Sequence, residues 1–164
     1  MKIALHGCAG KMCSKVFELC EKDDDIEVVA GIDKNNNTTT EFPVLKLRGE
    51  MFMSVPGIDV VINFSDASAV EELVICCKRN HVPVVVCTTG MDQSTLKCIE
   101  DAAKVIPVVQ SANMSIGVNM LLGKIGNMAS LLLPQGFDVE IVENTTTRSL
   151  MPQAAQRSRL LMLL

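Results

Sequence analysis

A short glycine-containing turn follows the first apolar run of the chain and has the composition of a phosphate-binding loop. The turn is G-C-A-G-K-M-C, from Gly7 to Cys13, and a helical pattern begins inside it. Gly7 permits a tight turn, Gly10 lets the backbone approach a ligand, and the first N–H groups of a helix attract phosphate oxygens. Cys13 stands where a dinucleotide-binding fingerprint has its third glycine. A glycine turn that serves packing alone is the alternative.

An acidic residue lies at the distance expected for ribose recognition. Asp33 ends the second apolar run, about 20 residues after the turn, where a carboxylate can accept hydrogen bonds from ribose hydroxyls. Lys34 follows it and could meet the 2′-phosphate that distinguishes NADPH from NADH. Asp33 and Lys34 together therefore do not decide between NADH and NADPH. The alternatives are a turn or capping role for Asp33 and a solvated charge at Lys34.

Three further polar groups follow predicted strands: N-F-S-D at 63–66, C-T-T-G at 87–90 and S-A-N-M-S-I-G-V-N at 111–119. Each alone is typical of a turn or a helix cap. Ligands of parallel sheets bind at the carboxyl ends of the strands, so these groups are expected to share one site. The predicted cofactor-binding residues are Gly7, Cys8, Ala9, Gly10, Lys11 and Met12 at the pyrophosphate, Asp33 and Lys34 at the adenosine ribose, and Cys87, Thr88, Thr89, Ser111, Ala112, Asn113 and Met114 around the nicotinamide.

The elements that must position these residues alternate along the chain. The apolar pattern predicts strands at 2–6, 27–33, 59–64, 83–87 and 106–109, and helices at 11–22, 67–80 and 92–104. Ser65 or Asp66 is the expected N-cap of the second helix. Buried strands alternating with amphipathic helices indicate an α/β fold with a Rossmann-like, doubly wound parallel sheet. The stretch 44–55 is ambiguous.

The character of the sequence changes after residue 113. A long apolar helix is predicted at 116–133, with Met120, Leu121 and Ile125 on its inward face. An alternating strand is predicted at 138–143. Residues 144–164 have no clear period and end in bare Leu and Met.

Composition argues against several classes of protein. The 164 residues carry a net charge of −4 and contain no Trp or Tyr, which disfavours nucleic-acid binding. The seven cysteines form no C-x-x-C pair, which favours reduced, buried thiols over a zinc site or a disulfide framework. No run reaches the length of a transmembrane helix without interruption. We therefore expect a cytoplasmic protein with no metal site and no nucleic-acid or membrane partner.

In order and spacing, these motifs resemble the dihydrodipicolinate reductase (4-hydroxy-tetrahydrodipicolinate reductase) family. The family pattern comprises G-x-x-G-x-M-G, an acidic residue after the second strand, D-F-[ST], G-T-T-G and A-N-[MF]-S-x-G-V-N, and the resemblance covers residues 1–143. The last two motifs are specific to the family. The chain departs from the pattern at Cys13 and Cys87, which replace Gly, and at Asn63, which replaces Asp. Cys87 puts a side chain where backbone is expected to meet the cofactor, so weaker affinity is expected.

The resemblance implies hydride transfer from NADH or NADPH to a cyclic, unsaturated dicarboxylate in lysine and diaminopimelate biosynthesis. It implies a dinucleotide-binding domain over 1–113 and, over 114–143, the start of an α+β domain that binds substrate and builds a homotetramer. It also implies the signature E-x-H-H-x-x-K-x-D-A-P-S-G-T-A, in which His is the general acid, beginning at Glu143. That signature is absent, because no His follows His81 and no Lys follows Lys124. No catalytic residue is therefore assigned.

A one-base slip after the Glu143 codon would account for the missing signature. Permitted codons for residues 144–158, regrouped from the last base of the Asn144 codon, translate as H-H-N-Q-K-S-D-A-P-S-G-T-A-L. Third bases are chosen freely in this regrouping, but the first and second bases, which are mostly forced, fix much of the result. Residues 144–164 are then an out-of-frame tail. A truly divergent tail is the alternative.

The slip has consequences for the chain as written. We expect it to lack reductase activity and to be poorly soluble, because an apolar helix and a strand edge lose their partners. Assembly into the homotetramer is doubtful for the same reason. The competing hypothesis is a non-catalytic fragment that binds a nicotinamide dinucleotide. The run A-N-M-S-I-G-V-N disfavours a Rossmann-like domain of some other enzyme.

Overall fold

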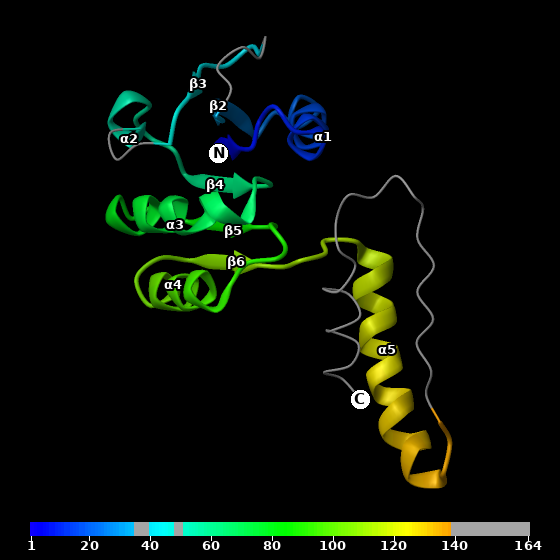
Figure 1. Ribbon diagram of the computed structural model, residues 1–164. Helices are drawn as coiled ribbons and strands as arrows, with labels where there is room; N and C mark the ends of the chain where they lie inside the picture. The colour runs from blue at the N-terminus through cyan, green and yellow to red at the C-terminus, as the bar shows by residue number, and fades with distance from the viewer. Residues whose placement is uncertain (35–39, 48–50, 139–164) are drawn as a thin grey trace. The chain divides into compact units, whose positions relative to one another are not determined.

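A parallel sheet flanked by helices forms the first part of the chain (Figure 1). The computed structural model describes residues 1–34, 40–47 and 51–138. The strands are β1 (Lys2–His6), β2 (Glu27–Ile32), β3 (Val44–Leu45), β4 (Val60–Asn63), β5 (Val84–Val86) and β6 (Val108–Gln110). The helices are α1 (Lys11–Cys20), α2 (Met51–Ser54), α3 (Val70–Arg79), α4 (Gln93–Ala103) and α5 (Ile116–Leu132), with 3-10 turns η1 (Ala67–Ala69) and η2 (Leu133–Gln135).

The order of the strands is β3-β2-β1-β4-β5-β6, and every neighbouring pair is parallel. The chain therefore winds outward in one direction from β1 through β2 to β3, and in the other from β4 to β6. Open sheets of this kind bind ligands at the carboxyl ends of the strands where the winding reverses. The predicted Rossmann-like fold is confirmed, and its reversal lies between β1 and β4.

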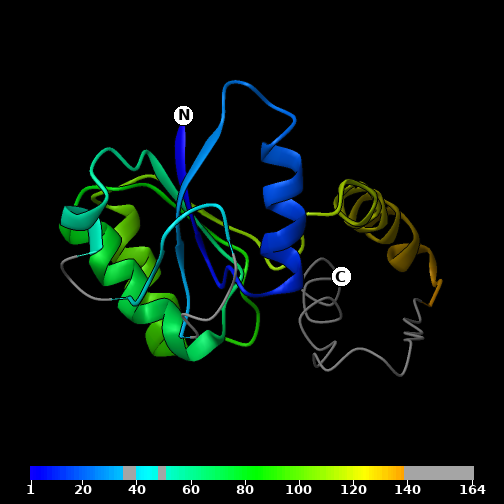
Figure 2. The ribbon, with the colours of Figure 1, turned by 90° about the horizontal axis from the view of Figure 1, so that it is seen from above.

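Helices cover the sheet on both faces (Figure 2). On one face, Leu5 of β1 belongs to the same buried apolar cluster as Cys13 of α1. On the other, Ala4 belongs to a cluster that includes Leu73 of α3 and Ile99 of α4. Successive residues of β1 thus enter opposite cores, as the two-residue period of a strand requires. Burial on both faces explains why the strands are near-continuous apolar runs.

The start of the predicted helix at 67–80 differs from the expectation. Residues 67–69 form η1, and α3 begins only at Val70. Asp66 precedes η1 but makes no side-chain capping bond; its carboxylate lies 2.9 Å from Nζ of Lys34 instead. Ser65 is not the cap either; its hydroxyl donates to the carbonyl oxygen of Asp66. The predicted cap is therefore wrong, and Asp66 forms a long-range ion pair. The ambiguous stretch 44–55 contains β3 and α2.

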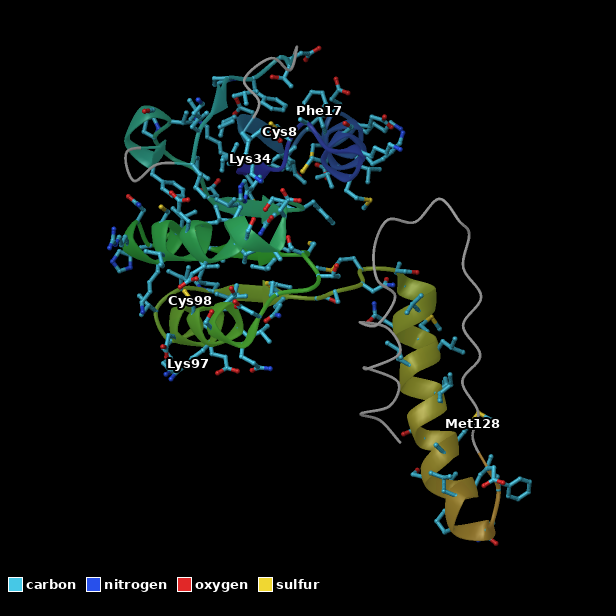
Figure 3. All side chains as sticks on the ribbon, in the orientation of Figure 1. Cys8, Phe17, Lys34, Lys97, Cys98 and Met128 are labelled. Carbon is cyan, nitrogen blue, oxygen red and sulfur yellow. The ribbon has the colours of Figure 1, made fainter. Side chains whose placement is uncertain are left out.

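The chain divides into two compact units, Met1–Ser111 and a second that begins at Ala112. The second contains α5, at the predicted position but with a different inward face. Leu122 and Ala129 are buried, whereas Met120, Leu121 and Met128 are exposed. Figure 3 labels Met128 on this helix. Because α5 is apolar on most sides, no hydrophobic period selected one face.

The segment Ile116–Gln135 is long and apolar enough to cross a membrane, judged by length and composition alone. The expectation was that no run reaches such a length without interruption; Ile116–Gln135 reaches the length, with polar interruptions inside it. The single charge at Lys124 and the small polar residues of α5 interrupt the run without making it polar overall. Apart from Asp138, the predicted strand at 138–143 and the tail at 144–164 lie outside the described residues.

Candidate functional site

The turn after β1 is closed by backbone contacts that require glycine. Gly7 has a φ of +84°, and its N–H donates to the carbonyl oxygen of Ile32 at 2.8 Å. A Cβ at Gly7 would lie 2.8 Å from the carbonyl oxygen of Phe64, so a side chain does not fit there. The N–H of Gly10 donates to the carbonyl oxygen of Gly7 at 2.9 Å. The turn is thereby fixed between the ends of β2 and β4.

The N-terminus of α1 has no side-chain cap. Its N-cap residue is Gly10, and its first turn contains no acidic residue. By contrast, α4 and α5 are capped by Asp92 and Ser115, whose side-chain oxygens accept hydrogen bonds from the N–H groups of Thr95 and Val118. The first N–H groups of a helix have no partner within it and favour anions. Helix α3 is uncapped as well, but its first turn carries Glu71 and Glu72, which disfavour an anion there. Among α1, α3, α4 and α5, α1 is thus the helix whose N-terminus has neither a side-chain cap nor an acidic residue.

Asp33 connects the turn to the end of β2. Its Oδ2 accepts a hydrogen bond from the N–H of Ala9 at 3.1 Å. Lys34, the next residue, pairs with Asp66 at the start of η1, and both side chains are largely exposed. The hydrogen-bonded pairing raises the pKa of Lys34 and lowers that of Asp66. The ribose-binding acid predicted from the sequence thus lies beside the predicted pyrophosphate turn.

Asn63 ties the ends of β4 and β5 together. Its side chain is fully buried, and Oδ1 accepts hydrogen bonds from the N–H of Ser65 at 2.7 Å and from Oγ1 of Thr88 at 3.3 Å. Oγ1 of Thr88 also lies 3.0 Å from the carbonyl oxygen of Ser65, to which it can donate instead. Asn63 Nδ2 has no hydrogen-bond partner among the described residues. The N-F-S-D motif marks this position in the sequence, but the role of Asn63 could not be predicted from it. The one signal was a polar residue at the end of an apolar strand.

His6 is a buried titratable residue that sequence analysis missed. It ends β1, is 5% exposed, and its Cα is paired with that of Asn63 in the β1–β4 register. Burial lowers the pKa of His6 to about 4, although the neighbouring carboxylate of Asp33 acts in the opposite direction. The ring is therefore neutral near pH 7. The one feature of the sequence that pointed to His6 was its position directly before the glycine turn.

The two cysteines of the turn are packed rather than reactive. Cys8 and Phe17 lie together on the α1 side of the sheet (Figure 3). Cys13, at the third glycine position of the fingerprint, is 1% exposed, and its Sγ contacts the carbonyl oxygen of His6 at 3.5 Å. Burial raises the pKa of Cys13 to about 12. The helix N-terminus does not activate this thiol, because desolvation of the thiolate dominates.

Cys87, which follows β5, and Ser111, which follows β6, lie at the same edge of the sheet as the end of β4. The N–H of Cys87 donates to the carbonyl oxygen of Asn63, and the N–H of Ser111 donates to that of Val86, both at 3.0 Å. Cys87 is half-buried, and burial raises its pKa to about 11. The predicted site residues that the first unit gathers at its carboxyl edge are Gly7, Cys8, Ala9, Gly10, Lys11, Met12, Asp33, Lys34, Cys87, Thr88, Thr89 and Ser111.

The remaining predicted residues, Ala112, Asn113 and Met114, belong to the second unit. Asn113 Oδ1 accepts a hydrogen bond from the N–H of Ser115 at 2.7 Å, and Asn119 Nδ2 donates to the carbonyl oxygen of Asn113 at 2.9 Å. Asn113 thus stabilises the entry into α5, and its role at a cofactor stays a prediction. In the described part of the chain, no group of three or more His, Cys, Asp or Glu residues is placed to hold a metal ion.

The fold is similar to that of solved reductases and dehydrogenases. A dipicolinate-bound dihydrodipicolinate reductase from Paenisporosarcina sp. TG-14 superposes with a TM-score of 0.78 at 22% identity, over 99% of this chain and 64% of that one. The WlbA dehydrogenase from Chromobacterium violaceum, solved with NADH and UDP-GlcNAcA, has a TM-score of 0.58 at 17% identity, over 79% and 40% of the two chains. At such identities the likeness shows the fold alone.

Sequence comparison identifies the family. The 4-hydroxy-tetrahydrodipicolinate reductase of Caldanaerobacter subterraneus subsp. tengcongensis is 41% identical over 143 residues, which are 87% of this chain and 55% of that protein. The reductase of the same name from Clostridium tetani is 39% identical over 144 residues, 87% of this chain and 54% of that protein. The chain thus spans about half the length of the curated relatives it matches. The family described as "Dihydrodipicolinate reductase, N-terminus" matches residues 1–114. The chain belongs to the dihydrodipicolinate reductase family.

Proposed function

We propose that the first unit, Met1–Ser111, binds a nicotinamide dinucleotide at the carboxyl edge of the sheet between β1 and β4. The observation that carries this proposal is the uncapped N-terminus of α1 directly beside Asp33, whose carboxylate is held by the N–H of Ala9 at 3.1 Å. That arrangement offers N–H donors to a pyrophosphate and a carboxylate to a ribose at the winding reversal. NADH and NADPH are both candidates.

The residues at this edge fit the shape and chemistry of such a cofactor. A Cβ at Gly7 would occupy the space next to Phe64, so the close backbone approach depends on glycine. Thr88 and Thr89 follow β5 and Ser111 follows β6, where the nicotinamide ribose would lie. When bound, the dinucleotide supplies the hydride. The role of this chain's own residues is to bind and orient it; the NADH in the WlbA dehydrogenase of the same fold supports the assignment.

We further propose that the whole protein reduces 4-hydroxy-tetrahydrodipicolinate to tetrahydrodipicolinate in lysine and diaminopimelate biosynthesis. The names of the relatives at 41% and 39% identity support this, as does the dipicolinate in the Paenisporosarcina structure. In this proposal residues 114–143 begin the domain that binds the dicarboxylate and builds a homotetramer. The protein would act in the cytoplasm without nucleic-acid or membrane partners.

The frame slip after Glu143 forms part of the proposal. The match to the Caldanaerobacter relative covers 143 residues, or 87% of this chain, so the likeness to the family is not confined to the first unit. Residues 144–164 contain neither His nor Lys, whereas the shifted frame can encode a His-His signature followed by Lys. The catalytic His and Lys would therefore come from the shifted frame, and the chain as written would lack them.

One inserted base tests the catalytic part of the proposal. A gene with its frame restored after the Glu143 codon should yield a product that oxidises NADH or NADPH when 4-hydroxy-tetrahydrodipicolinate is added. The 164-residue chain should bind the dinucleotide without turnover. Turnover by the 164-residue chain would contradict the proposal, as would an inactive restored chain that still binds dinucleotide.

A non-catalytic dinucleotide-binding fragment is the second candidate. It is favoured by the absence of the family's His and Lys signature from the chain after Glu143. The nucleotide sequence of codons 144–158 separates the two. The slip requires that these codons, shifted by one base, encode the His-His signature, whereas a fragment with a truly divergent tail has no such hidden signature.

A further inference from the structure

We infer that Asp66 biases the site toward NADH over NADPH by holding the ammonium group of Lys34. This inference rests on the proposed dinucleotide site. Asp66, which is not among the predicted cofactor-binding residues, would then influence which of the two cofactors this edge of the sheet accepts.

The Lys34–Asp66 ion pair connects the ends of β2 and β4, which lie on either side of β1. Lys34 follows β2 and Asp66 follows β4, and β1 lies between these two strands in the sheet. Lys34 Nζ and Asp66 Oδ2 are 2.9 Å apart although the residues are 32 positions apart in the sequence (Figure 3 labels Lys34). The ion pair therefore crosses the carboxyl end of β1, next to the predicted ribose position at Asp33.

A 2′-phosphate brought to this position would need a cation. It carries roughly −1.5 to −2 charge at pH 7, whereas the 2′-hydroxyl of NADH is neutral. Asp33 is already beside the turn, and Lys34 is engaged by a second carboxylate. One ammonium between two carboxylates leaves the group negative overall. NADPH must therefore displace Asp66 from Lys34 and overcome its repulsion, whereas NADH needs neither.

Within the described residues, the carboxylate of Asp66 makes its hydrogen bond to Lys34, and its charge acts more weakly on His6. It makes no capping bond to η1, and the hydrogen bond at this point comes from its backbone, whose carbonyl oxygen accepts from the N–H of Ala69 at 3.0 Å. Its side chain is 73% exposed and that of Lys34 is 71% exposed. Asp66→Asn should therefore remove the charge without disturbing the fold.

The experiment measures the dissociation constants of NADH and NADPH with the full chain. Fluorescence anisotropy of the reduced nicotinamide reports binding, and the chain contains no Trp or Tyr that would add emission. Asp66→Asn should strengthen NADPH binding by up to about fivefold relative to NADH at low salt, the upper end of the range expected for exposed ion pairs. The gain should shrink as salt is added, because the Debye length falls to about 3 Å at 1 M.

A double-mutant cycle shows whether Asp66 acts through Lys34. Lys34→Gln alone should weaken NADPH relative to NADH, because it leaves the carboxylate of Asp66 without its cation. The gain from Asp66→Asn should be clearly smaller in the Lys34→Gln background than in the wild type, because no ammonium is then released for the 2′-phosphate. Asp101→Asn is the matched control. Asp101 forms a similar exposed pair with Lys104 at 2.7 Å, near the end of α4. This control should leave the preference unchanged.

The outcomes separate this inference from the proposal beneath it. Binding of both cofactors with an unchanged preference in Asp66→Asn would overturn the inference alone. A gain of the same size in the Lys34→Gln background would overturn it too, because repulsion by Asp66 alone would then suffice. If neither NADH nor NADPH binds the folded wild-type chain, the dinucleotide site itself is wrong and the inference falls with it.

Discussion

The backbone N–H of Ala9 donates a hydrogen bond to Oδ2 of Asp33 at 3.1 Å, which fastens the glycine turn to the end of β2. The two residues are 24 positions apart in the sequence. One carboxylate therefore has two tasks: it shapes the turn that would receive the pyrophosphate, and it would accept hydrogen bonds from the ribose.

Asp33→Ala should weaken the binding of both NADH and NADPH. Loss of a hydrogen bond to a charged group costs about 1.5–3 kcal/mol, which corresponds to roughly tenfold or more in affinity. Titration of each dinucleotide into wild type and variant measures the change, with Asp101→Ala as a control distant in the fold. Wild-type affinity for both dinucleotides in Asp33→Ala would contradict the assignment of this residue.

Gly7→Ala should cost more stability than Gly57→Ala. Both glycines have a similar positive φ, +84° and +80°, so both variants carry about 1–2 kcal/mol of left-handed backbone strain. At Gly57 a Cβ would meet no atom within 4 Å, whereas at Gly7 it would be 2.8 Å from a backbone oxygen of Phe64. The unfolding free energies of the two variants, measured in urea, differ by the cost of the clash with Phe64. Equal losses of unfolding free energy would show that the turn at Gly7 is not closely packed.

Stability should fall as pH drops from 6.5 to about 4 because of His6. The pKa of His6 is about 4 when folded and 6.5 when unfolded, so between these values the unfolded chain binds more protons and the free energy of unfolding rises with pH. The full contribution, present above pH 6.5, is at most roughly 3 kcal/mol. The difference in unfolding free energy between wild type and His6→Gln should change by this amount between pH 7 and pH 4, because only the wild type loses the contribution of His6. Parallel curves would mean that His6 is not buried as a neutral ring.

Thr88→Val should loosen the link between the ends of β4 and β5. The hydroxyl of Thr88 lies within hydrogen-bond distance of Oδ1 of the buried Asn63 and of the carbonyl oxygen of the half-buried Ser65. Leaving these acceptors without that donor should cost about 1–3 kcal/mol of unfolding free energy. Thr88→Ser keeps the hydroxyl and should recover most of the loss. No recovery in the serine variant would assign the effect to the methyl group instead.

The dinucleotide should protect Cys87 from alkylation but not Cys98. Both thiols are half-buried, and burial raises the pKa of each, so both should react slowly near pH 7. Cys87 follows β5 at the proposed nicotinamide end, whereas Cys98 is in α4. Mass spectrometry after timed alkylation, with and without NADH, compares the two sites within one sample. Equal protection of both thiols would indicate a general stabilisation of the fold rather than contact at Cys87.

The regular elements of the first unit could be predicted because local and global signals agree there. The run at 59–64 is buried on both faces in the parallel sheet, and β4 occupies Val60–Asn63 within it. By contrast, β3 is two residues long, too short for any hydrophobic period. The inward face of α5 could not be predicted, since apolar residues surround the helix.

The missed features of the site are long-range. The Lys34–Asp66 pair joins residues 32 positions apart, and Asp66 makes no side-chain capping bond to η1. The burial of His6 depends on its register with Asn63 in another strand. Sequence spacing located the turn and Asp33, but these pairings arise only when β2, β1 and β4 are side by side.

Titration of NADH and NADPH into the folded 164-residue chain, wild type and Gly7→Ala, tests the central claim most directly. We expect saturable binding of one dinucleotide per wild-type chain, lost or strongly weakened in Gly7→Ala. Absence of binding by either dinucleotide to wild-type chain that unfolds cooperatively in urea would contradict the proposed site, as would equal binding to the Gly7→Ala variant.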